Sequence, residues 1–435
     1  MRMKMDKTTV SFHTFGCRLN QAETAGIERT FENAQFRVVD IAQPADVVVI
    51  NTCTVTEGGD TDTRRLVNKI NRLNPHSRIA LIGCQAQVQR DKLLDLPNVF
   101  WVVGNAKKMD LAEIVSSTGD ESAPQAIVPA IPRGDFTMPV AAIDHRHRRA
   151  NLKIQDGCDF FCSFCEIPYA RGRARSRQFA DILTEANALT AAGHQEIILT
   201  GINLGTYETD GKKLLDVLTA LESIPKLERI RISSIEPTTI PWELFERMKE
   251  RTKLCRYLHV PLQSGEDEIL RDMKRKYTVD EFRTFLQRVR SVVPQICIGT
   301  DVIAGFPGET DRHFESTYTF LRDLPLSYIH VFSYSERRFA KSKDHVDPVP
   351  AAVIARRSER LRELSLRKRQ IFLRSLLGTR QEVLFEELKD GWWVGLTDHY
   401  ARVKVRSEED LLNRFKEVLL KELNGQIVEG ELLHP

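Results

Sequence analysis

The sequence lacks a long apolar run. Stretches such as Val47 to Ile50 and Ile79 to Gly83 are far shorter than the ~20 residues of a membrane-spanning helix. The opening residues, MRMKMDKTTV, also lack the apolar core of a secretion signal. We therefore expect a cytoplasmic protein with no membrane partner. Because thiols stay reduced in that compartment, the eight cysteines are expected to serve metal or redox chemistry and not disulfides.

The net charge is also close to zero. The 63 Lys and Arg residues face 60 Asp and Glu residues, which leaves +3. Any affinity for nucleic acid must then come from local basic patches. No short repeat or low-complexity tract is visible, which argues against a solenoid. With 435 residues, 42% apolar and 28% charged, the chain is typical of two or three ordinary globular domains, and a single small module or a disordered chain is excluded.

Strands alternate with helices at the start of the chain. The β-rich runs lie at 8–15, 45–52 and 78–83. Helical stretches separate them, which predicts an open parallel α/β domain over residues 1–140. Residues 117–135 contain Gly, Pro and small polar residues and are expected to form a linker or a long loop.

The same alternation continues in the middle of the chain. Six strand candidates lie at 150–156, 196–201, 227–234, 256–262, 295–305 and 328–335. Six βα units exceed what a small open sheet needs, so residues 141–375 are predicted to form a partial (βα)6 barrel. Functional groups are then expected at the carboxyl ends of its strands.

The last part of the chain is different. After a basic helix at 355–375, five short strands are predicted at 380–388, 391–397, 400–407, 415–423 and 425–433. No helical pattern separates them. Residues 376–435 are therefore expected to form a small all-β barrel of the OB type, a shape that often binds nucleic acid.

Three cysteines follow the first predicted barrel strand. Cys158, Cys162 and Cys165 lie within eight residues, so they can hold one metal centre but leave one of four positions open. An iron–sulfur cluster with one iron free of protein ligands fits that count. The alternatives are a zinc site missing one ligand or three buried thiols, and the lack of a fourth Cys or His nearby disfavours zinc. Phe164 is expected to shield the cluster or flank a bound cofactor.

Three other cysteines are far apart in sequence. Cys17, Cys53 and Cys84 each come directly after a predicted strand of the first domain. Parallel strands present their carboxyl ends at one edge, so we expect these thiols to converge and hold a second cluster. A single buried cysteine is more often a small apolar residue than a ligand. That simpler interpretation is preferred for Cys255 and Cys297, which have no partners at ligand spacing.

At this point a family resemblance is visible along nearly the whole chain. It is carried by GCRLNQAET, NTCTVTEGGDTDTRR, GCQAQ, QDGCDFFCSFCEIPYARGRARSR, LTGINLG, SSIEP, HVPLQSG and TDVIAGFPGET. Together these motifs resemble the methylthiotransferases, radical S-adenosylmethionine (SAM) enzymes with a second cluster and a C-terminal TRAM domain. The first two motifs are most similar to the branch that acts on threonylcarbamoyladenosine in tRNA. The chain departs from the family at Glu166, where an apolar residue is usual, and in SYSERRFAKSKD, which lacks the usual Gly-Thr.

The resemblance implies a reaction and its cofactors. Two 4Fe-4S clusters and SAM would add a methylthio group to carbon 2 of threonylcarbamoyladenosine at position 37 of tRNA. The cluster on Cys158, Cys162 and Cys165 would bind and reduce SAM, and the resulting radical would remove the hydrogen. The cluster on the other three cysteines would deliver methylated sulfur. The implied partners are the tRNA anticodon stem-loop, an electron donor such as flavodoxin or ferredoxin, and a sulfur source.

Two alternatives stay open. The same chemistry is compatible with isopentenyladenosine in tRNA or with a ribosomal protein as substrate. The second alternative is a non-catalytic iron–sulfur protein that only binds RNA.

Four residues are candidates for cofactor contacts at the barrel strands. Gly201 and Asn203 lie where the superfamily resemblance places the SAM amino group, although a plain strand-to-helix turn is the alternative. Gln263 and Asp301 are candidates by position alone. His259 is expected to be packed and hydrogen-bonded and not catalytic.

Basic and aromatic residues form the candidate RNA surface. The basic segments are residues 145–149, the four arginines from Arg171 to Arg177, and the helix at 355–375, with a solvated charged face as the alternative. Trp392, Trp393 and Tyr400 are candidates for stacking on tRNA bases. Adjacent tryptophans on a strand point to opposite faces, so one of the two is expected in the barrel core.

Overall fold

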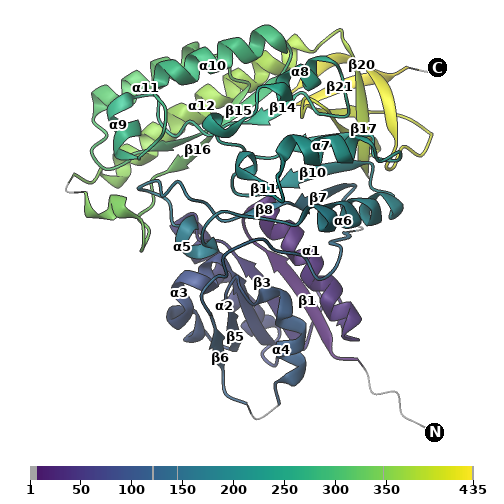
Figure 1. Ribbon diagram of the computed structural model, residues 1–435, viewed down its shortest axis with the longest axis vertical. Helices are drawn as coiled ribbons and strands as arrows, with labels where there is room; N and C mark the ends of the chain where they lie inside the picture. Colours follow the sequence, from purple (N-terminus) through teal and green to yellow (C-terminus); the bar gives the residue numbers. More distant parts are fainter. Residues whose placement is uncertain (1–6, 120–121, 145, 346, 434–435) are drawn as a thin grey trace.

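The computed structural model describes residues 7–119, 122–144, 146–345 and 347–433 (Figure 1). The N-terminal sheet domain lies at the lower end of the view, a partial barrel occupies the centre and top, and a small β-barrel lies at the upper right. The predicted α/β class, with an all-β barrel at the end, is confirmed. None of the helices in the described part of the chain has the length and apolar character needed to cross a membrane. His145, predicted in a basic segment, lies outside the described residues.

The N-terminal domain is a six-stranded parallel sheet in the order β2-β1-β3-β4-β5-β6. Its strands are β1 (Thr9–Thr14), β2 (Arg37–Val38), β3 (Val47–Thr52), β4 (Arg78–Gly83), β5 (Val99–Val103) and β6 (Gln125–Ile127). The helices are α1 (Arg18–Asn33), α2 (Glu57–Leu73), α3 (Cys84–Leu94) and α4 (Leu111–Ser117). Every residue of β3 is buried, as a central strand covered on both faces requires.

One prediction for this domain is wrong. Residues 117–135 were expected to be linker or loop, but β6 lies inside them and pairs in parallel with β5. The strand is short and at the sheet edge, and its residues are only half-buried or exposed. Such a strand lacks the run of apolar residues that marks a central strand, so its pairing depends on the neighbouring backbone and not on its composition.

The central part has the six parallel strands expected of a partial barrel. The strands are β7 (Arg149–Lys153), β10 (Glu196–Thr200), β13 (Arg229–Ile232), β14 (Tyr257–His259), β15 (Cys297–Ala304) and β16 (Tyr328–Ser333). They form two three-stranded sheets, and a parallel bridge between Ser234 and His259 joins these at β13 and β14. The strands therefore follow one another in chain order, and their carboxyl ends meet at one rim.

Helices cover the outside of this partial barrel (Figure 1). They are α6 (Phe179–Ala191), α7 (Leu214–Glu222), α8 (Glu243–Lys249), α9 (Asp267–Asp272), α10 (Val279–Val292), α11 (Asp311–Asp323) and α12 (Ala351–Ser375). The short helix α5 (Ile167–Arg171) instead packs against α3 of the N-terminal domain. A small two-stranded sheet of β8 (Gln155–Asp156) and β9 (Arg175–Ser176) brackets the loop that carries the first cysteine trio.

The C-terminal part is a closed barrel in the order β17-β18-β19-β21-β20, as predicted from the five short strands. Its strands are β17 (Arg380–Lys389), β18 (Trp392–Thr397), β19 (Arg402–Val405), β20 (Phe415–Asn424) and β21 (Ile427–Leu432). One apolar cluster joins this barrel to the partial barrel, and both Cys255 and Cys297 are fully buried in it. Their predicted role as core residues is confirmed.

A buried group of charges joins the N-terminal domain to the partial barrel. Glu23 on α1 accepts hydrogen bonds from Lys108 (2.5 Å), Lys153 (2.7 Å) and both Nη atoms of Arg171 (3.0 Å each). Asp156 binds Lys153 and Arg171 from the other side. Lys153, Asp156 and Arg171 belong to the barrel, so this group fixes how α1 lies against β7.

Candidate active site

The first cysteine trio lies in the loop between β8 and α5. Burial raises the pKa of Cys158 to about 11, and burial with Cys162 and Cys158 nearby raises that of Cys165 further. The raised pKa values keep these thiols neutral at neutral pH when no metal is bound. Cys162 accepts a hydrogen bond from Arg275 Nη1 (3.2 Å), and Cys158 accepts one from the backbone N–H of Phe160 (3.5 Å). Three thiols in one loop, two of them accepting N–H hydrogen bonds, fit an iron–sulfur cluster, whose binding would release their protons.

The second trio converges at the carboxyl edge of the N-terminal sheet. Cys17 caps α1 after β1, Cys53 follows β3, and Cys84 is the first residue of α3 after β4. Burial raises the pKa of Cys53 to about 12, with smaller increases caused by Cys84 and Cys17. Because β1, β3 and β4 are neighbours in the parallel sheet, the three cysteines lie at adjacent strand ends, as predicted, and their binding of a second cluster stays a prediction.

Gly16 makes the close approach of two of these thiols feasible. Its φ is +94°, in the left-handed region, and a Cβ there would lie 2.8 Å from Cys53 Cβ and 2.9 Å from its sulfur. Any larger residue would therefore push the Cys17 turn away from Cys53.

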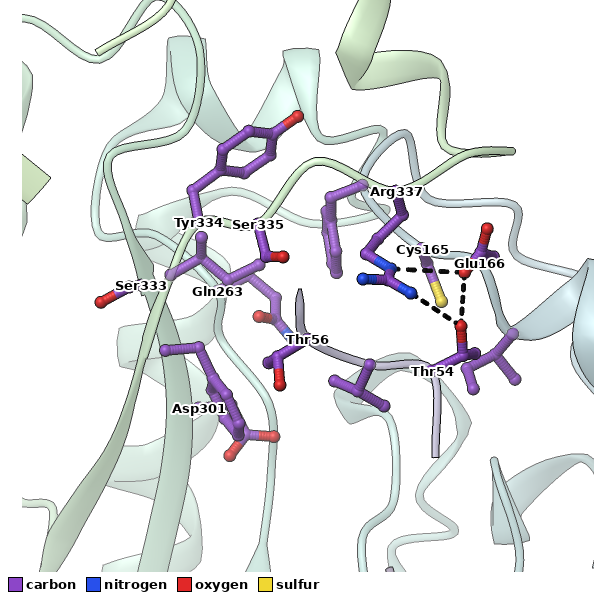
Figure 2. Close-up of a pocket in the computed structure, with 15 residues that line it drawn as sticks. Thr54, Thr56, Cys165, Glu166, Gln263, Asp301, Ser333, Tyr334, Ser335 and Arg337 are labelled. Atoms are coloured by element: carbon purple, nitrogen blue, oxygen red, sulfur yellow. Dashed lines mark hydrogen bonds and ion pairs between the residues drawn. The ribbon is translucent and has the colours of Figure 1, made fainter. Parts of the chain in front are cut away.

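Two adjoining cavities lie beside cysteines of both trios. A cavity of about 590 Å³ is lined by Cys17 and Cys53 from the sheet edge and by Gly201 and Asp301 from the barrel rim. A smaller one of about 160 Å³ is lined by Phe164, Cys165, Gln263 and Asp301, and Figure 2 shows it from inside. The two linings share Val55, Thr56, Asp301 and Phe332. Cys165 of the first trio and Cys17 and Cys53 of the second therefore line adjoining cavities, as a shared reaction chamber requires.

Not all the residues predicted to contact the cofactor at the barrel strands line the two cavities. Gly201 lines the larger cavity, and a Cβ there would lie 3.0 Å from Gln155. The Gln155 side chain accepts from the backbone N–H of Ile202 (2.8 Å) and of Asn203 (2.9 Å), which holds this turn. Asn203 is buried outside both cavity linings, where its Oδ1 accepts from Thr239. Contact of the Asn203 side chain with a cofactor stays a prediction.

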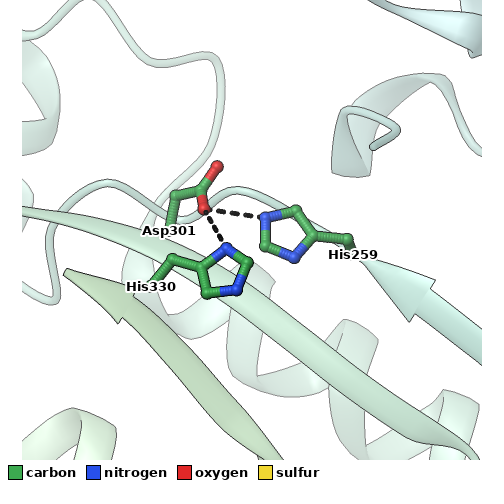
Figure 3. A group of neighbouring side chains, drawn as sticks. All are labelled: His259, Asp301 and His330. Carbon is green, nitrogen blue, oxygen red and sulfur yellow. Dashed lines mark hydrogen bonds and ion pairs between the residues drawn. The ribbon is translucent and has the colours of Figure 1, made fainter. Parts of the chain in front are cut away.

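Asp301 is held between two imidazoles at the barrel rim (Figure 3). Its Oδ1 lies 2.8 Å from His259 Nε2 and 3.5 Å from His330 Nδ1, and His259 Nδ1 lies 3.1 Å from the Tyr328 hydroxyl. Burial would raise the pKa of Asp301, but the two histidines lower it, so the side chain is a carboxylate. His259 is packed and hydrogen-bonded, as predicted. Its ring also lines the larger cavity.

Comparison with known proteins identifies the chain. A model of the Radical SAM superfamily matches residues 152–321, and a model described as Uncharacterized protein family UPF0004 matches residues 9–104. The threonylcarbamoyladenosine tRNA methylthiotransferase MtaB of Bacillus subtilis is 36% identical over 438 residues, which cover 98% of this chain and 96% of that protein. The chain belongs to the radical SAM methylthiotransferase family.

Other matches support the family and the fold. A tRNA-2-methylthio-N(6)-dimethylallyladenosine synthase of Dehalococcoides mccartyi is 34% identical over 397 residues, 88% of each chain. The radical SAM methyltransferase TsrM from Kitasatospora setae superposes with a TM-score of 0.55 over 75% of each chain, at 17% identity, which shows a shared fold. As a radical SAM methylthiotransferase, the chain is an enzyme that uses SAM and an iron–sulfur cluster. The predicted family is confirmed, and the non-catalytic alternative is excluded.

Glu166, one of the two departures from the methylthiotransferase pattern, is bonded to Arg337 in the segment that contains the other. Glu166 follows Cys165 directly, and Arg337 lies in SYSERRFAKSKD. Glu166 Oε2 accepts from Arg337 Nε (3.3 Å) and from the Thr54 hydroxyl (2.7 Å), and Arg337 Nη2 donates to Thr54 (2.9 Å) (Figure 2). Arg337 Nη2 also donates to Asp60 (2.9 Å). All four side chains are buried or nearly so. The departure at Glu166 is thus balanced by Arg337, and the pair ties the cluster loop to the N-terminal domain.

Replacing Arg337 by Met is expected to lower the free energy of unfolding by about 3–5 kcal/mol. The change would leave the carboxylates of Glu166 and Asp60 buried without their cation. Thermal unfolding followed by circular dichroism measures the loss. The neighbouring Arg338→Met is the matched control, because Arg338 is exposed and donates only a 3.4 Å hydrogen bond to the Val88 carbonyl. Equal stability losses in the two variants would contradict the proposed balance.

Several basic residues predicted to bind RNA are structural in this methylthiotransferase. Arg171 and Arg177 are fully buried, paired with Glu23 and Glu185 respectively. On α12, Arg357 and Lys368 are also buried. Arg173 and the remaining arginines of α12 that face solvent stay candidates. The prediction is wrong for the buried residues because a basic run in sequence does not show which carboxylates the fold brings against it.

The three aromatic residues predicted to stack on tRNA bases lie in different surroundings. Trp393 is buried in the closed barrel, which confirms that one tryptophan of the pair is a core residue. Trp392 is half-buried beneath Lys404 and Arg406. Tyr400 packs on Tyr257 and lines the larger cavity, so it is part of the chamber wall, and its stacking on a tRNA base stays a prediction.

Sequence reasoning missed two residues that contact the thiol trios. Arg275, which donates to Cys162, lies 113 positions away along the chain. Asn105 Nδ2 approaches Cys84 Sγ at 3.7 Å and donates to the Ala170 carbonyl at 2.7 Å. Neither lies at a spacing that links it to a cysteine motif, so only the fold could identify them.

Proposed function

We propose that this enzyme holds two 4Fe-4S clusters and converts threonylcarbamoyladenosine beside the tRNA anticodon into its 2-methylthio derivative. The observation that supports the proposal is that Cys165 of the first trio and Cys17 and Cys53 of the second line two adjoining cavities that share four residues. A C–H bond without a leaving group must be activated in the same chamber in which sulfur is delivered. When SAM is bound at an iron–sulfur cluster, it supplies the radical chemistry for that activation.

The chain's own residues would hold and orient the cofactors. Cys158, Cys162 and Cys165 are proposed ligands of the first cluster, and Cys17, Cys53 and Cys84 of the second. Phe164, Gly201, Gln263 and Asp301 are placed on the cavity walls, where they would flank SAM and the target base. Electrons from a donor such as flavodoxin or ferredoxin and a separate sulfur source would complete the reaction.

The choice of substrate rests on the relatives and on the opening motifs. The Bacillus subtilis relative is named for threonylcarbamoyladenosine, whereas the Dehalococcoides mccartyi relative is named for dimethylallyladenosine. The GCRLNQAET motif favours the former.

Mass spectrometry of tRNA nucleosides from a deletion strain tests the substrate. We expect the methylthio form of threonylcarbamoyladenosine to disappear and the parent nucleoside to accumulate, with both changes reversed by the wild-type gene. Loss of the methylthio form of isopentenyladenosine instead would assign the enzyme to that substrate. If all tRNA nucleosides stayed unchanged, a ribosomal protein would become the target to examine.

A further inference from the structure

Arg18 is a cation without a carboxylate partner in the part of the chain that the structure describes. It is the first residue of α1 and directly follows Cys17. Its Nη2 donates to the Tyr400 hydroxyl at 2.8 Å. Within residues 7–119, 122–144, 146–345 and 347–433, no carboxylate forms an ion pair with it, and the first turn of α1 contains no acidic residue. A cation at a helix N-terminus is unfavourable unless an anion approaches it.

A second guanidinium with a spare donor lies beside it. Arg149 pairs with Glu386 through Nε (2.7 Å), but its buried Nη1 has no hydrogen-bond partner among the described residues. The guanidinium carbons of Arg18 and Arg149 are each 5.9 Å from the centre of the Tyr400 ring. Burial alone would raise the pKa of Tyr400, yet the surrounding arginines, Arg18 first, bring it below its ordinary value. The region around this hydroxyl is therefore positive.

The positive region is accessible from the reaction chamber. Cys17, Arg18 and Tyr400 line the 590 Å³ cavity. Past Arg18, a hollow of about 420 Å³ continues between the N-terminal domain and the barrel, with Arg149 and Glu386 on its wall. A ligand whose reacting atom lies near Cys17 can thus extend a charged group to Arg18 without leaving the cavity.

We propose that Arg18, supported by Tyr400 and Arg149, binds the carboxylate of the threonylcarbamoyl group on the target adenosine. This inference rests on the proposed function. The substituent on N6 starts from the same edge of the base as carbon 2, where sulfur is added, and it ends in a carboxylate. A guanidinium fork binds a carboxylate through two parallel hydrogen bonds. The isopentenyl group is apolar and would leave the cation unpaired, so Arg18 would select one substrate over the other.

The test measures binding of anticodon stem-loop RNAs to the holoenzyme under anaerobic conditions. Three RNAs of one sequence carry threonylcarbamoyladenosine, its threonine-amide analogue, or isopentenyladenosine. The wild type should bind the RNA with threonylcarbamoyladenosine (the acid) at least about ten-fold more tightly than the RNA with the threonine-amide analogue (the amide). Arg18→Gln should bring the two affinities within about two-fold of each other while leaving affinity for the amide nearly unchanged. Arg18→Lys, which keeps the charge but not the fork, should show an intermediate preference and gives a second, independent measurement.

The other outcomes distinguish the proposed substrate from the proposed role of Arg18. If the wild type binds the isopentenyl RNA as tightly as the acid, the proposed substrate is wrong. If the wild type prefers the acid and both Arg18 variants keep that preference, the proposed function stands and the role of Arg18 is refuted. A variant that weakens all three RNAs equally would show that Arg18 contacts a backbone phosphate, which also overturns the inference.

Discussion

Replacing Cys17, Cys53 and Cys84 together by Ala is expected to lower the iron bound after anaerobic reconstitution from about eight to about four atoms per chain. The variant should still cleave SAM, since Cys158, Cys162 and Cys165 lie in a separate loop of the barrel with their own N–H donors. It should transfer no sulfur, because the sheet edge facing the chamber would no longer hold a metal. Iron analysis, 5′-deoxyadenosine release and tRNA nucleoside analysis measure the three quantities.

The chain offers a matched control for this variant. Cys255 and Cys297 are buried in the apolar cluster between the two barrels, away from both cavity linings. Their double Ala variant should keep the full iron content and the transfer activity. Undiminished iron in the triple variant would remove the second cluster from the proposal. Loss of SAM cleavage in it would contradict the separation of the two centres.

The site residues that could be predicted are those that directly follow a strand. Cys17, Cys53 and Cys84 could be grouped because each follows a β-rich run, and parallel strands end at one edge whatever their separation in sequence. The partial barrel followed from counting six such runs. Edge strands such as β6 were missed, since an edge strand needs neither alternation nor apolar residues to pair.

The parts that could not be predicted are long-range polar contacts. Arg171 lies in a run of arginines that resembles a solvated basic face, but Glu23 and Asp156 surround it in a fully buried group. Similarly, Tyr400 looks like an exposed aromatic residue on a barrel strand. Its position in the chamber wall depends on how the closed barrel packs against β13 and β14, which no local pattern in the sequence contains.

Glu23→Gln is expected to lower the free energy of unfolding by about 3–5 kcal/mol, the largest stability loss that we predict for a single isosteric change. Glu23 is fully buried, and its carboxylate is the shared partner of Arg171, Lys108 and Lys153. A glutamine would leave Lys153 and Arg171 with Asp156 as their carboxylate and would take from Lys108 the carboxylate that it pairs with. Burial raises the pKa of Glu23, but these cations lower it well below its ordinary value. The stabilisation is therefore present at neutral pH and is lost as pH falls through that lowered pKa.

Melting temperatures measured between neutral and acidic pH check both parts of this prediction. The difference between wild type and Glu23→Gln should be large at neutral pH and shrink only below the ordinary titration range of a glutamate. Glu32→Gln on the same helix is the control, because Glu32 and its partner Arg29 are each about half exposed (48% and 50%), and its loss should not exceed about 0.5 kcal/mol. A small, pH-independent loss in Glu23→Gln would mean that water or a shifted lysine compensates the buried charges. The buried charges around Glu23 would then not be the contact that holds α1, with Cys17 at its start, against the partial barrel.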